Sequence, residues 1–501
     1  MQRTRVMPNL EFSFQHALVH DVAYNTLLKS HRRDLHGRLT EMLEGRREMR
    51  GRLELLAHHA YQARQWAKAV IYGRKAGRQM VAASRNAEAV EIFERALEAI
   101  DHLKPTRRIL DRSVDIRIDL VEAAYPLGRP EQARRRLCEA EDIVTGTADQ
   151  HRLAKVLSHR SLIHWAAGDV LKAIDAGKTS LQLARQRGNQ ELEILNSGRL
   201  GALYIGRGSF EAASSLLERS IGLIPSDMNH CRYGLLNVAS VSNRAALARC
   251  LAELGRFAEA IRIGDEAVQI AEEVGHTFSQ IYANLWVGDI LQKKGDFARS
   301  IPLLETCVAL CKRSGSDLLY PSSASSLGFA MVQTGRAEEG FVLLEMAKEM
   351  ALEKGILWNY PNQLSLLSET RLLVGEQEQA LALATEALEA SVRSGEKAFE
   401  ARSLWLLGEV HNARGKQPDP IAHRYFTKAW DMAKGHRMMP LAAHCHRGLG
   451  AFFLKHRAPR KAEEQFTAAI SVYRGLDMRH WLDATMIDAR LTSDVRAARV
   501  H

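Results

Sequence analysis

The sequence predicts an all-α fold, a right-handed superhelical solenoid of helical hairpins with about 40 residues per repeat. Three observations predict it: a composition suited to helices, glycines at a regular spacing, and apolar residues at helical spacing between those glycines. Of the 501 residues 46% are hydrophobic, yet only 6% are aromatic and only 12 are proline. A chain of this length exceeds one ordinary hydrophobic core, and this composition favours growth by stacking repeats.

Glycines mark the period in two series that alternate about every 20 residues. The first series, assigned to the turn inside each hairpin, is Gly128, Gly168 and Gly208, then, after a step of 47, Gly255, Gly295, Gly335, Gly375 and Gly415. The second series, assigned to the turns between hairpins, is Gly275, Gly315, Gly355, Gly395, Gly435 and Gly475. Such regularity over several hundred residues indicates a repeat architecture.

The segments between these glycines have the pattern of amphipathic helices. In residues 276–292, Phe278, Ile281, Leu285 and Trp286 recur at helical spacing, and residues 297–313 show the same pattern. Basic residues stand before several of the glycines, which is a signal of a helix C-terminus. Each period is therefore predicted to contain two helices of about 17 residues, each roughly 25 Å long.

Small residues occupy two further fixed positions, one on each helix of a hairpin. Seven residues before the turn glycine stand Ser161, Gly201, Ala248, Gly288, Gly328, Ser368 and Gly408. Five residues after it stand Ala133, Ala173, Ala213, Ala260, Ser300, Gly340 and Ala380. A small residue on each helix lets the two backbones approach closely, and a bulky one at either position would cost about 1–3 kcal/mol.

This pattern resembles the tetratricopeptide repeat, over roughly residues 55–485. It departs from that family in its period of about 40 residues, which implies longer helices, as in the long-helix repeats of large bacterial regulators. The 47-residue step predicts a loop at 224–234, and the residues at 416–420 predict an insertion of two. In the last hairpin Lys455 and His456 replace the expected glycine, while Gly448 and Ala462 still fit the small positions.

A second resemblance concerns residues 11–44. They are similar to the segment that links the ATPase module to the helical repeats in bacterial adenylate and guanylate cyclases with an AAA-like ATPase, and in MalT-like transcription regulators. The resembling residues are Phe12, Phe14, His16, Leu18, Asp21, Ala23, Tyr24, Leu27, Arg33, Leu35 and His36. The predicted organisation is a remnant of a winged-helix-like segment at 1–50, degenerate hairpins at 51–110, the solenoid at 111–485 and a tail at 486–501.

Motifs for catalysis and cofactor binding are not found in the sequence. It contains neither a G-x-x-x-x-G-K-[ST] phosphate loop nor a cyclase-like segment, so we expect no enzyme activity and no cofactor. The six cysteines form no C-x-x-C pair, and Cys307 and Cys311 are expected to be small buried residues in a reducing cytoplasm. No metal site is predicted: His16 and His20 lack a third ligand, and the pairs His58/His59 and His444/His446 are expected to face different sides of their helices.

The excess of positive charge is concentrated in the N-terminal fifth of the chain. Residues 1–110 hold 20 Lys and Arg against 12 Asp and Glu, out of a net charge of +10 for the whole chain. A nucleic-acid partner for this region stays a less favoured alternative, because no aromatic reading motif accompanies the charge. Neither a signal peptide nor a membrane-spanning apolar run is present, so the expected location is the cytoplasm.

The concave face of such a solenoid is the surface on which a partner is expected to bind. Residues near the small position of the first helices are the candidates for lining it: Arg199, Arg249, Trp286, Asp289, Trp405 and Glu409. The leading hypothesis is a protein-interaction scaffold for a protein or peptide ligand. By resemblance it would be the regulatory or sensing region of a cyclase/ATPase signalling protein, with the catalytic module encoded upstream. The alternative is an enzyme by family association.

Overall fold

The structure is a computed structural model that describes residues 2–5, 11–13, 22, 24–45, 53–83, 85–127, 129–167, 169–233, 235, 237–414 and 419–497. It divides into two compact units, unit 1 (Met1–His159) and unit 2 (Arg160–His501). The predicted all-α superhelical repeat fold is confirmed, with one small addition. Two short antiparallel strands, β1 (Gln2–Arg5) and β2 (Glu11–Ser13), pair near the N-terminus.

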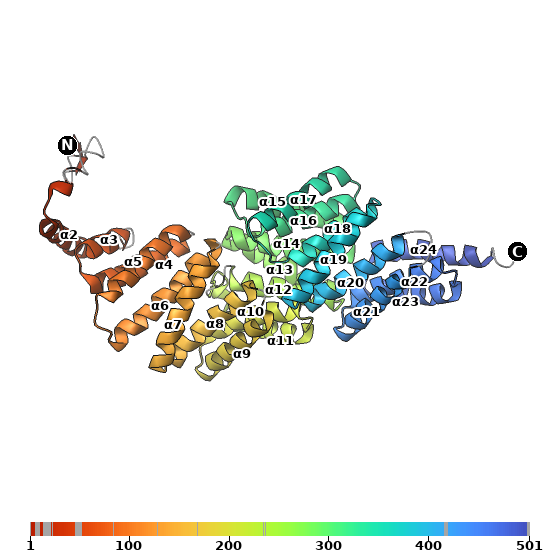
Figure 1. Ribbon diagram of the computed structural model, residues 1–501, viewed down its shortest axis with the longest axis horizontal. Coiled ribbons are helices and arrows are strands. Elements are labelled where there is room, and N and C mark those ends of the chain that lie inside the picture. The colour runs from red at the N-terminus through yellow and green to blue at the C-terminus, as the bar shows by residue number, and fades with distance from the viewer. Residues whose placement is uncertain are drawn as a thin grey trace. The chain divides into compact units, whose positions relative to one another are not determined.

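Unit 1 contains a stack of helices that follows the strands (Figure 1). Its helices are α2 (Lys29–Glu44), α3 (Leu53–Gln62), α4 (Trp66–Ala82), α5 (Asn86–Asp101), α6 (Arg107–Ala124), α7 (Pro130–Thr147) and the first part of α8 (Gln150–Ala166), with the 3-10 turn η1 (Tyr125–Leu127) after α6.

Unit 2 continues the repeat through regular hairpins. Its helices are α9 (Val170–Gln186), α10 (Gln190–Gly206), α11 (Phe210–Leu223), α12 (Ala239–Glu253), α13 (Phe257–Val274), α14 (Thr277–Lys294), α15 (Phe297–Ser314), α16 (Tyr320–Gln333), α17 (Ala337–Glu353), α18 (Tyr360–Leu373), α19 (Gln377–Ser394), α20 (Lys397–Ala413), α21 (Pro420–Gly435), α22 (Met439–Lys455), α23 (Pro459–Gly475) and α24 (Arg479–Ala497). The 3-10 turn η2 (Ser226–Met228) lies in the predicted loop between α11 and α12.

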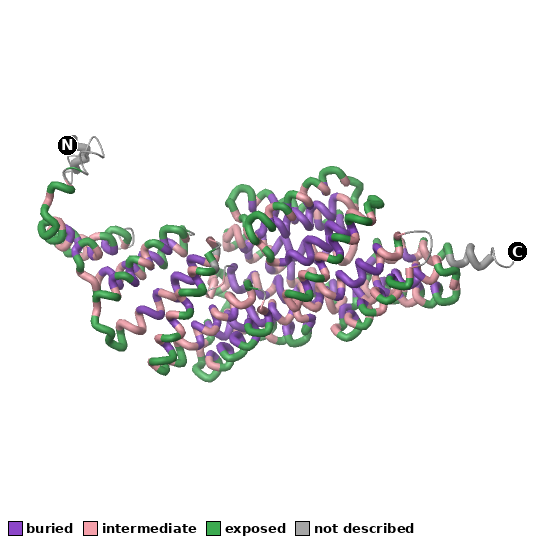
Figure 2. The backbone as a smooth tube through the Cα atoms, in the orientation of Figure 1, coloured by how far each residue is buried: buried purple, intermediate pink, exposed green. Residues whose placement is uncertain are grey.

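The two helices of each hairpin in unit 2 differ in burial. The even-numbered helices contact the next even-numbered helix as well as their hairpin partner, so they form the inner layer. Helix α16 is buried along nearly its whole length, whereas its partner α17 buries only Gly340, Leu344, Ala347 and Ala351. Figure 2 shows the buried residues on the packed sides of the helices and the exposed ones at the turns. A peptide or protein would therefore reach the inner layer only from inside the superhelix.

Glycines take the left-handed backbone conformation in the turns of unit 2. Gly255, Gly295, Gly335 and Gly375, which lie inside hairpins, have φ between 82° and 92°. Residues with a Cβ adopt such angles at a cost, which explains why glycine recurs there. Gly128, Gly168 and Gly415 of the same series lie outside the described residues.

After Gly395 the turns shift by two residues, and the glycine series is wrong there. Gly435 and Gly475 are the last residues of α21 and α23, while the left-handed conformation falls on Arg437 and Asp477, with φ of 55° and 53°. Arg437 lies 42 residues after Gly395, so a two-residue insertion between them accounts for the shift.

The same two-residue shift corrects the positions predicted for the last hairpin. Arg457, with φ of 54°, takes the turn expected at Lys455 and His456. The small position of α22 belongs to Gly450 instead of Gly448, because a Cβ at Gly450 would lie 2.7 Å from Phe466. A Cβ at Gly408 would meet Phe426 in the same way, at 2.6 Å.

In four hairpins the paired small residues lie against one another. A Cβ on either Gly328 or Gly340 would lie 2.5 Å from the carbonyl oxygen of the other, so backbone touches backbone there. Where a serine replaces one partner, its hydroxyl donates a hydrogen bond to the opposite carbonyl oxygen: Ser161 to Ala173 at 2.7 Å, Ser300 to Gly288 at 3.0 Å and Ser368 to Ala380 at 2.7 Å.

Helices far apart in the sequence of unit 2 also contact each other. Helices α10 and α20 touch, as do α12 and α22 (yellow to blue in Figure 1). Specific bonds join the two ends: His436 with the Gly208 carbonyl oxygen at 3.2 Å, Lys294 with Asp477 at 2.8 Å, and the Trp481 indole N–H with the Lys293 carbonyl oxygen at 3.3 Å. Stacked repeats alone contact only their neighbours, so unit 2 completes a superhelical turn and closes on itself.

Candidate functional site

The inner layer of unit 2 lines a partly open cavity of about 120 Å³. Helices α12, α14, α18, α20 and α22 supply most of its walls, and α16 and α24 contribute one aromatic residue each, Phe329 and Trp481. The wall mixes aromatic, aliphatic and charged side chains, with three carboxylates and three basic side chains among them. A cavity of this size accommodates one side chain or chain terminus of a ligand.

Arg249 and Trp286 form one wall. The Arg249 guanidinium lies over the Trp286 ring, 3.5 Å from its centroid, and Trp286 in turn packs edge-on against Trp358. Stacking on an indole holds the guanidinium in place but leaves its N–H donors available. In the part of the chain that the structure describes, no hydrogen bond or ion pair joins Arg249 to another residue.

The remaining charges of the cavity are paired more closely. Lys293 pairs with Glu253, and Arg402 donates to Glu369 at 3.1 Å. Asp289 accepts a hydrogen bond from the Ser326 hydroxyl at 2.6 Å, and burial raises the pKa of its carboxyl. Arg249 is thus the cation of the cavity that has no carboxylate in contact, among the described residues.

Two amide side chains, one on α18 and one in the turn before it, have carbonyl oxygens that accept no hydrogen bond from the described residues. Asn359 and Gln363 both donate to the Ser322 hydroxyl, at 3.4 Å and 3.2 Å. Their carbonyl oxygens, Asn359 Oδ1 and Gln363 Oε1, are buried and meet no donor among the described residues. Asn359, which also has a left-handed backbone with φ of 60°, lines the cavity. Buried acceptors without a donor are costly, so such atoms commonly mark water or ligand positions.

The structure brings four of the six candidate residues together. Arg249, Trp286, Asp289 and Trp405 line the cavity. Arg199 is buried in α10, at 5% exposure, away from this lining. Glu409, one turn beyond Trp405 on α20, also lies outside the lining, and burial together with the neighbouring Glu369 raises its pKa to about 7.

Sequence reasoning did not identify His444 and Arg402 as lining residues. Burial lowers the pKa of His444 to about 3, and its Nδ1 lies 2.7 Å from the Tyr473 hydroxyl. His444 also packs on Trp405 and Trp481, with ring centroids 5.3 Å and 4.8 Å away. The expectation that His444 is a structural residue fits this packing. Arg402 lies three residues before Trp405, a spacing that puts both on one face of α20 and could have revealed it.

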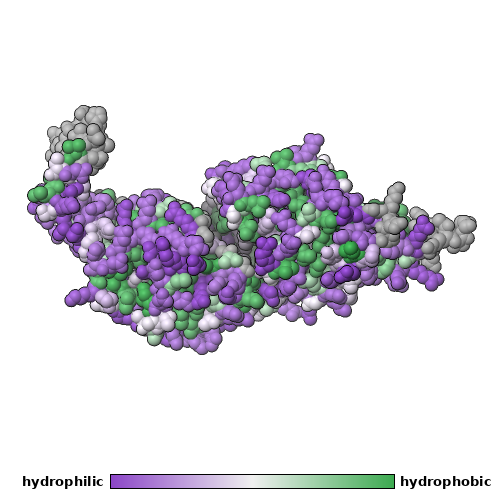
Figure 3. Space-filling view, viewed as in Figure 1, coloured by the Kyte–Doolittle hydropathy of each residue, from purple (hydrophilic) through white to green (hydrophobic). Residues whose placement is uncertain are grey.

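The other described parts of the chain offer less evidence of a binding site than this cavity does. Cys307 and Cys311 are buried, as expected, and burial raises the pKa of the Cys311 thiol to about 11. On the face that Figure 3 shows, hydrophilic residues predominate and hydrophobic ones are scattered among them. No helix among the described residues is both long and apolar enough to cross a bilayer.

Several arginines of unit 1 are paired within the unit. Arg74 bonds to Asp115 at 2.8 Å and to Asp119 at 2.6 Å, and Arg152 also bonds to Asp115, at 3.0 Å. Guanidinium groups held in this way are less available to phosphates.

Histidines of unit 1 depart from the sequence-based expectation. His58 and His59 were expected to face different sides of their helix, but ring nitrogens of both lie within 4.8 Å of a ring nitrogen of His36 and of each other. Packing of α2 against α3 brings the third ring in, and sequence spacing gave no sign of it. His16 and His20 lie outside the described residues.

Comparisons with known proteins agree with the fold. A tetratricopeptide-repeat family model matches residues 244–263, in α12 and α13. No protein of curated function matches the sequence. These residues and the folds below support a tetratricopeptide-type repeat protein.

Solved structures of similar fold include three Rap proteins. A Rap protein complexed with competence and sporulation factor shares 13% identity, with a TM-score of 0.55, over 74% of this chain and 99% of that one. The Rap conjugation gene regulator of plasmid pLS20 in complex with the Phr* peptide has a TM-score of 0.48 at 12% identity, over 75% and 97% of the two chains. The apo form of RapI has a TM-score of 0.44 at 12% identity, over 56% and 98%. At such identities the likeness concerns the fold alone.

Proposed function

We propose that this chain is a protein-interaction scaffold that binds a peptide or an extended segment of a partner protein inside the superhelical turn of unit 2. The observation that carries the proposal is Arg249, whose guanidinium stacks on Trp286 at the cavity wall and forms no ion pair among the described residues, although its charge also acts on the carboxyl groups of Asp289 and Glu396. An acidic side chain or a C-terminal carboxylate of the ligand would complete this pair. Bidentate bonds from arginine suit a carboxylate well.

The size and polarity of the cavity define what enters it. About 120 Å³ holds one anchoring group, so the rest of the ligand would extend along the inner helices. There the carbonyl oxygen of Asn359, which lines the cavity, would accept a hydrogen bond from a backbone N–H group. A similar fold has been solved as a Rap protein complexed with competence and sporulation factor, which is consistent with a ligand-binding role for this architecture.

The more specific part of the proposal is the regulatory or sensing region of a cyclase/ATPase signalling protein. It rests on the resemblance of residues 11–44, and we propose no catalytic role for this chain itself. The chain incubated with ATP and Mg²⁺ or Mn²⁺ is expected to release neither cyclic AMP nor ADP. Turnover above that of a heat-treated sample would favour an enzyme instead. A phosphate-loop ATPase encoded just upstream would support the signalling context.

Binding is tested with the full chain and a library of displayed random peptides. The expected result is enrichment of peptides with an acidic residue or a free C-terminus, whose affinity falls at least about tenfold in Arg249→Glu, since a charge-assisted pair becomes a repulsion. The matched control is Arg313→Glu on the outer helix α15, which carries the same charge change at an exposed position. No enrichment, or equal losses in both variants, would refute an anchor at Arg249.

A further inference from the structure

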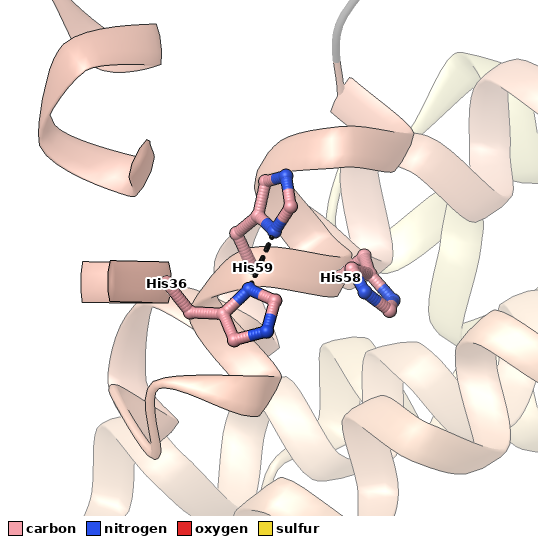
Figure 4. A group of neighbouring side chains, drawn as sticks. All are labelled: His36, His58 and His59. Carbon is pink, nitrogen blue, oxygen red and sulfur yellow. Dashed lines mark hydrogen bonds between the residues drawn. The ribbon is translucent and has the colours of Figure 1, made fainter. Parts of the chain in front are cut away.

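Three histidines of unit 1 converge between two helices. His36 is buried on α2, while His58 and His59 are consecutive residues of α3 (Figure 4). Their ring centroids form a triangle with sides of 5.0, 5.2 and 5.8 Å. Each ring offers a nitrogen within 4.8 Å of a nitrogen of the other two.

The orientation of His36 is fixed by a tyrosine. The Tyr24 hydroxyl lies 2.8 Å from His36 Nε2, and the Tyr24 ring packs edge-on against the imidazole. This contact engages Nε2 and leaves Nδ1 pointing toward His59. An outer hydrogen bond of this kind is what commonly orients a metal-binding histidine.

Two ring nitrogens face each other across a short gap. His36 Nδ1 and His59 Nδ1 are 2.8 Å apart (dashed line in Figure 4). This distance fits a hydrogen bond in which the N–H of one ring donates to the lone pair of the other, so one proton occupies the gap. A tetrahedral Zn²⁺, with bonds of about 2.1 Å, holds its ligand nitrogens about 3.4 Å apart. A slight opening of this gap, with rotation of the exposed His58, would therefore produce a three-nitrogen site.

We propose that His36, His58 and His59 form a binding site for a divalent transition-metal ion, with Zn²⁺ as the best fit. Three imidazoles and no carboxylate or thiolate make a donor set that suits Zn²⁺, Cu²⁺ or Ni²⁺ and excludes Ca²⁺ and Mg²⁺, which require oxygen ligands. A water molecule would complete the tetrahedron. The site belongs to unit 1 and is independent of the cavity of unit 2.

The ionisation of the cluster agrees with this chemistry. Burial, together with His58 and His36, lowers the pKa of His59 to about 4, and burial also lowers the pKa values of the other two rings. All three rings are thus neutral at neutral pH, which is the form that binds metals. Arg32 near His36 and Arg95 near His58 oppose a cation, so we expect moderate affinity.

The test uses the full chain, stripped with a chelator and then titrated with Zn²⁺ by calorimetry and with Co²⁺ by visible absorption. The expected results are one ion per chain, a raised melting temperature and the strong visible band of tetrahedral cobalt. His58→Ala is the decisive variant, because His58 is exposed and its loss does not disturb the core. It should weaken binding at least about tenfold, as loss of one of three ligands does.

The controls separate this site from other metal-binding groups. His31→Ala removes an exposed histidine from the same helix as His36 and should leave the titration unchanged. His59→Cys should keep the cobalt spectrum of the parent and add a sulfur-to-metal band. Circular dichroism checks that this variant has the helix content of the parent. If the parent chain binds no Zn²⁺ or Co²⁺, or if the parent and His58→Ala bind these ions equally well, the proposal is overturned.

Discussion

Both units stack helical hairpins, and ion pairs join inner helices in both, as Lys293 with Glu253 and Arg402 with Glu369 do in unit 2, but the other contacts differ. In unit 1 a ladder of charges crosses α4, α6 and α8, in which Asp115 bonds to both Arg74 and Arg152. In unit 2 small residues touch within each hairpin, and hydroxyl and amide groups bond between the inner helices, as Ser326 does with Asp289. Long arginine side chains bridge helices that stand apart, whereas glycine and serine allow backbone contact.

The difference has a geometric consequence. Unit 2 contains enough hairpins for helices far apart in the sequence to meet, as α10 meets α20 and α12 meets α22, with bonds between residues 183 to 228 positions apart. The described part of unit 1 contacts itself mainly between neighbouring helices. A partly open cavity lies among the inner helices of unit 2, while unit 1 offers a side-chain cluster between two helices.

The largest expected effect is in the charge ladder of unit 1. Arg74→Met leaves the buried Asp119 without its partner, which should lower the free energy of unfolding of that unit by about 3–5 kcal/mol. Urea unfolding followed by circular dichroism measures it. The double variant Arg74→Met/Asp119→Leu should recover most of the loss, because an apolar pair replaces the ion pair. A single variant as stable as the parent would show that the ladder does not hold unit 1.

Next in size is the closure of unit 2. Trp481 packs against Phe297 and His444 and bonds to Lys293. Trp481→Ala should cost about 2–3 kcal/mol, somewhat less than a fully buried tryptophan, and should open the turn. Small-angle X-ray scattering should then report a larger radius of gyration. Ile487→Ala, exposed on the same helix, should change neither quantity; an unchanged radius for Trp481→Ala would mean that the turn closes without this contact.

A smaller effect is expected at the backbone contact within one hairpin. Gly340→Ala places a methyl group 2.5 Å from the Gly328 carbonyl oxygen, so the net loss should be about 1–2 kcal/mol despite the better helix propensity of alanine. Gly222→Ala has open space around it and should gain up to about 1 kcal/mol. Thermal unfolding compares the two. Equal stabilisation of both variants would show that close approach is not what selects small residues.

The smallest effect depends on pH. Burial raises the pKa of Glu409 from its ordinary 4.5 to about 7, so the folded state keeps a proton that the unfolded chain has lost. This stabilising contribution is complete below about pH 4.5 and disappears as the pH rises through about 7. Glu409→Gln should remove this slope, so that the variant is more stable than the parent at pH 8. Melting temperatures measured across this range test it, and parallel curves for parent and variant would contradict it.

The sequence by itself determined the hairpin, because its rules are local. Gly255 and Gly295 mark turns, since only glycine takes a left-handed conformation without strain, and Gly328 and Gly340 mark the close contact, since no Cβ fits there. The same rules failed at Gly435 and Gly475. In the sequence, a glycine at the end of a helix looks the same as a glycine in a turn. Only the structure shows that Arg437 and Asp477 adopt the left-handed turn conformation.

Tertiary structure alone decided what lies beside what over long distances. The meeting of Arg249 with Trp405 in one cavity depends on the small rotation that each hairpin adds, summed over a full superhelical turn. Sequence placed both residues on inner helices but could not tell that Arg199 and Glu409 fall outside the lining. The approach of His36 to His58 and His59 depends likewise on how α2 packs on α3. The periodicity of the sequence determines each helix and turn. The closure of unit 2 and the convergence of distant side chains depend on the angles at which helices pack, which no short segment of the sequence specifies.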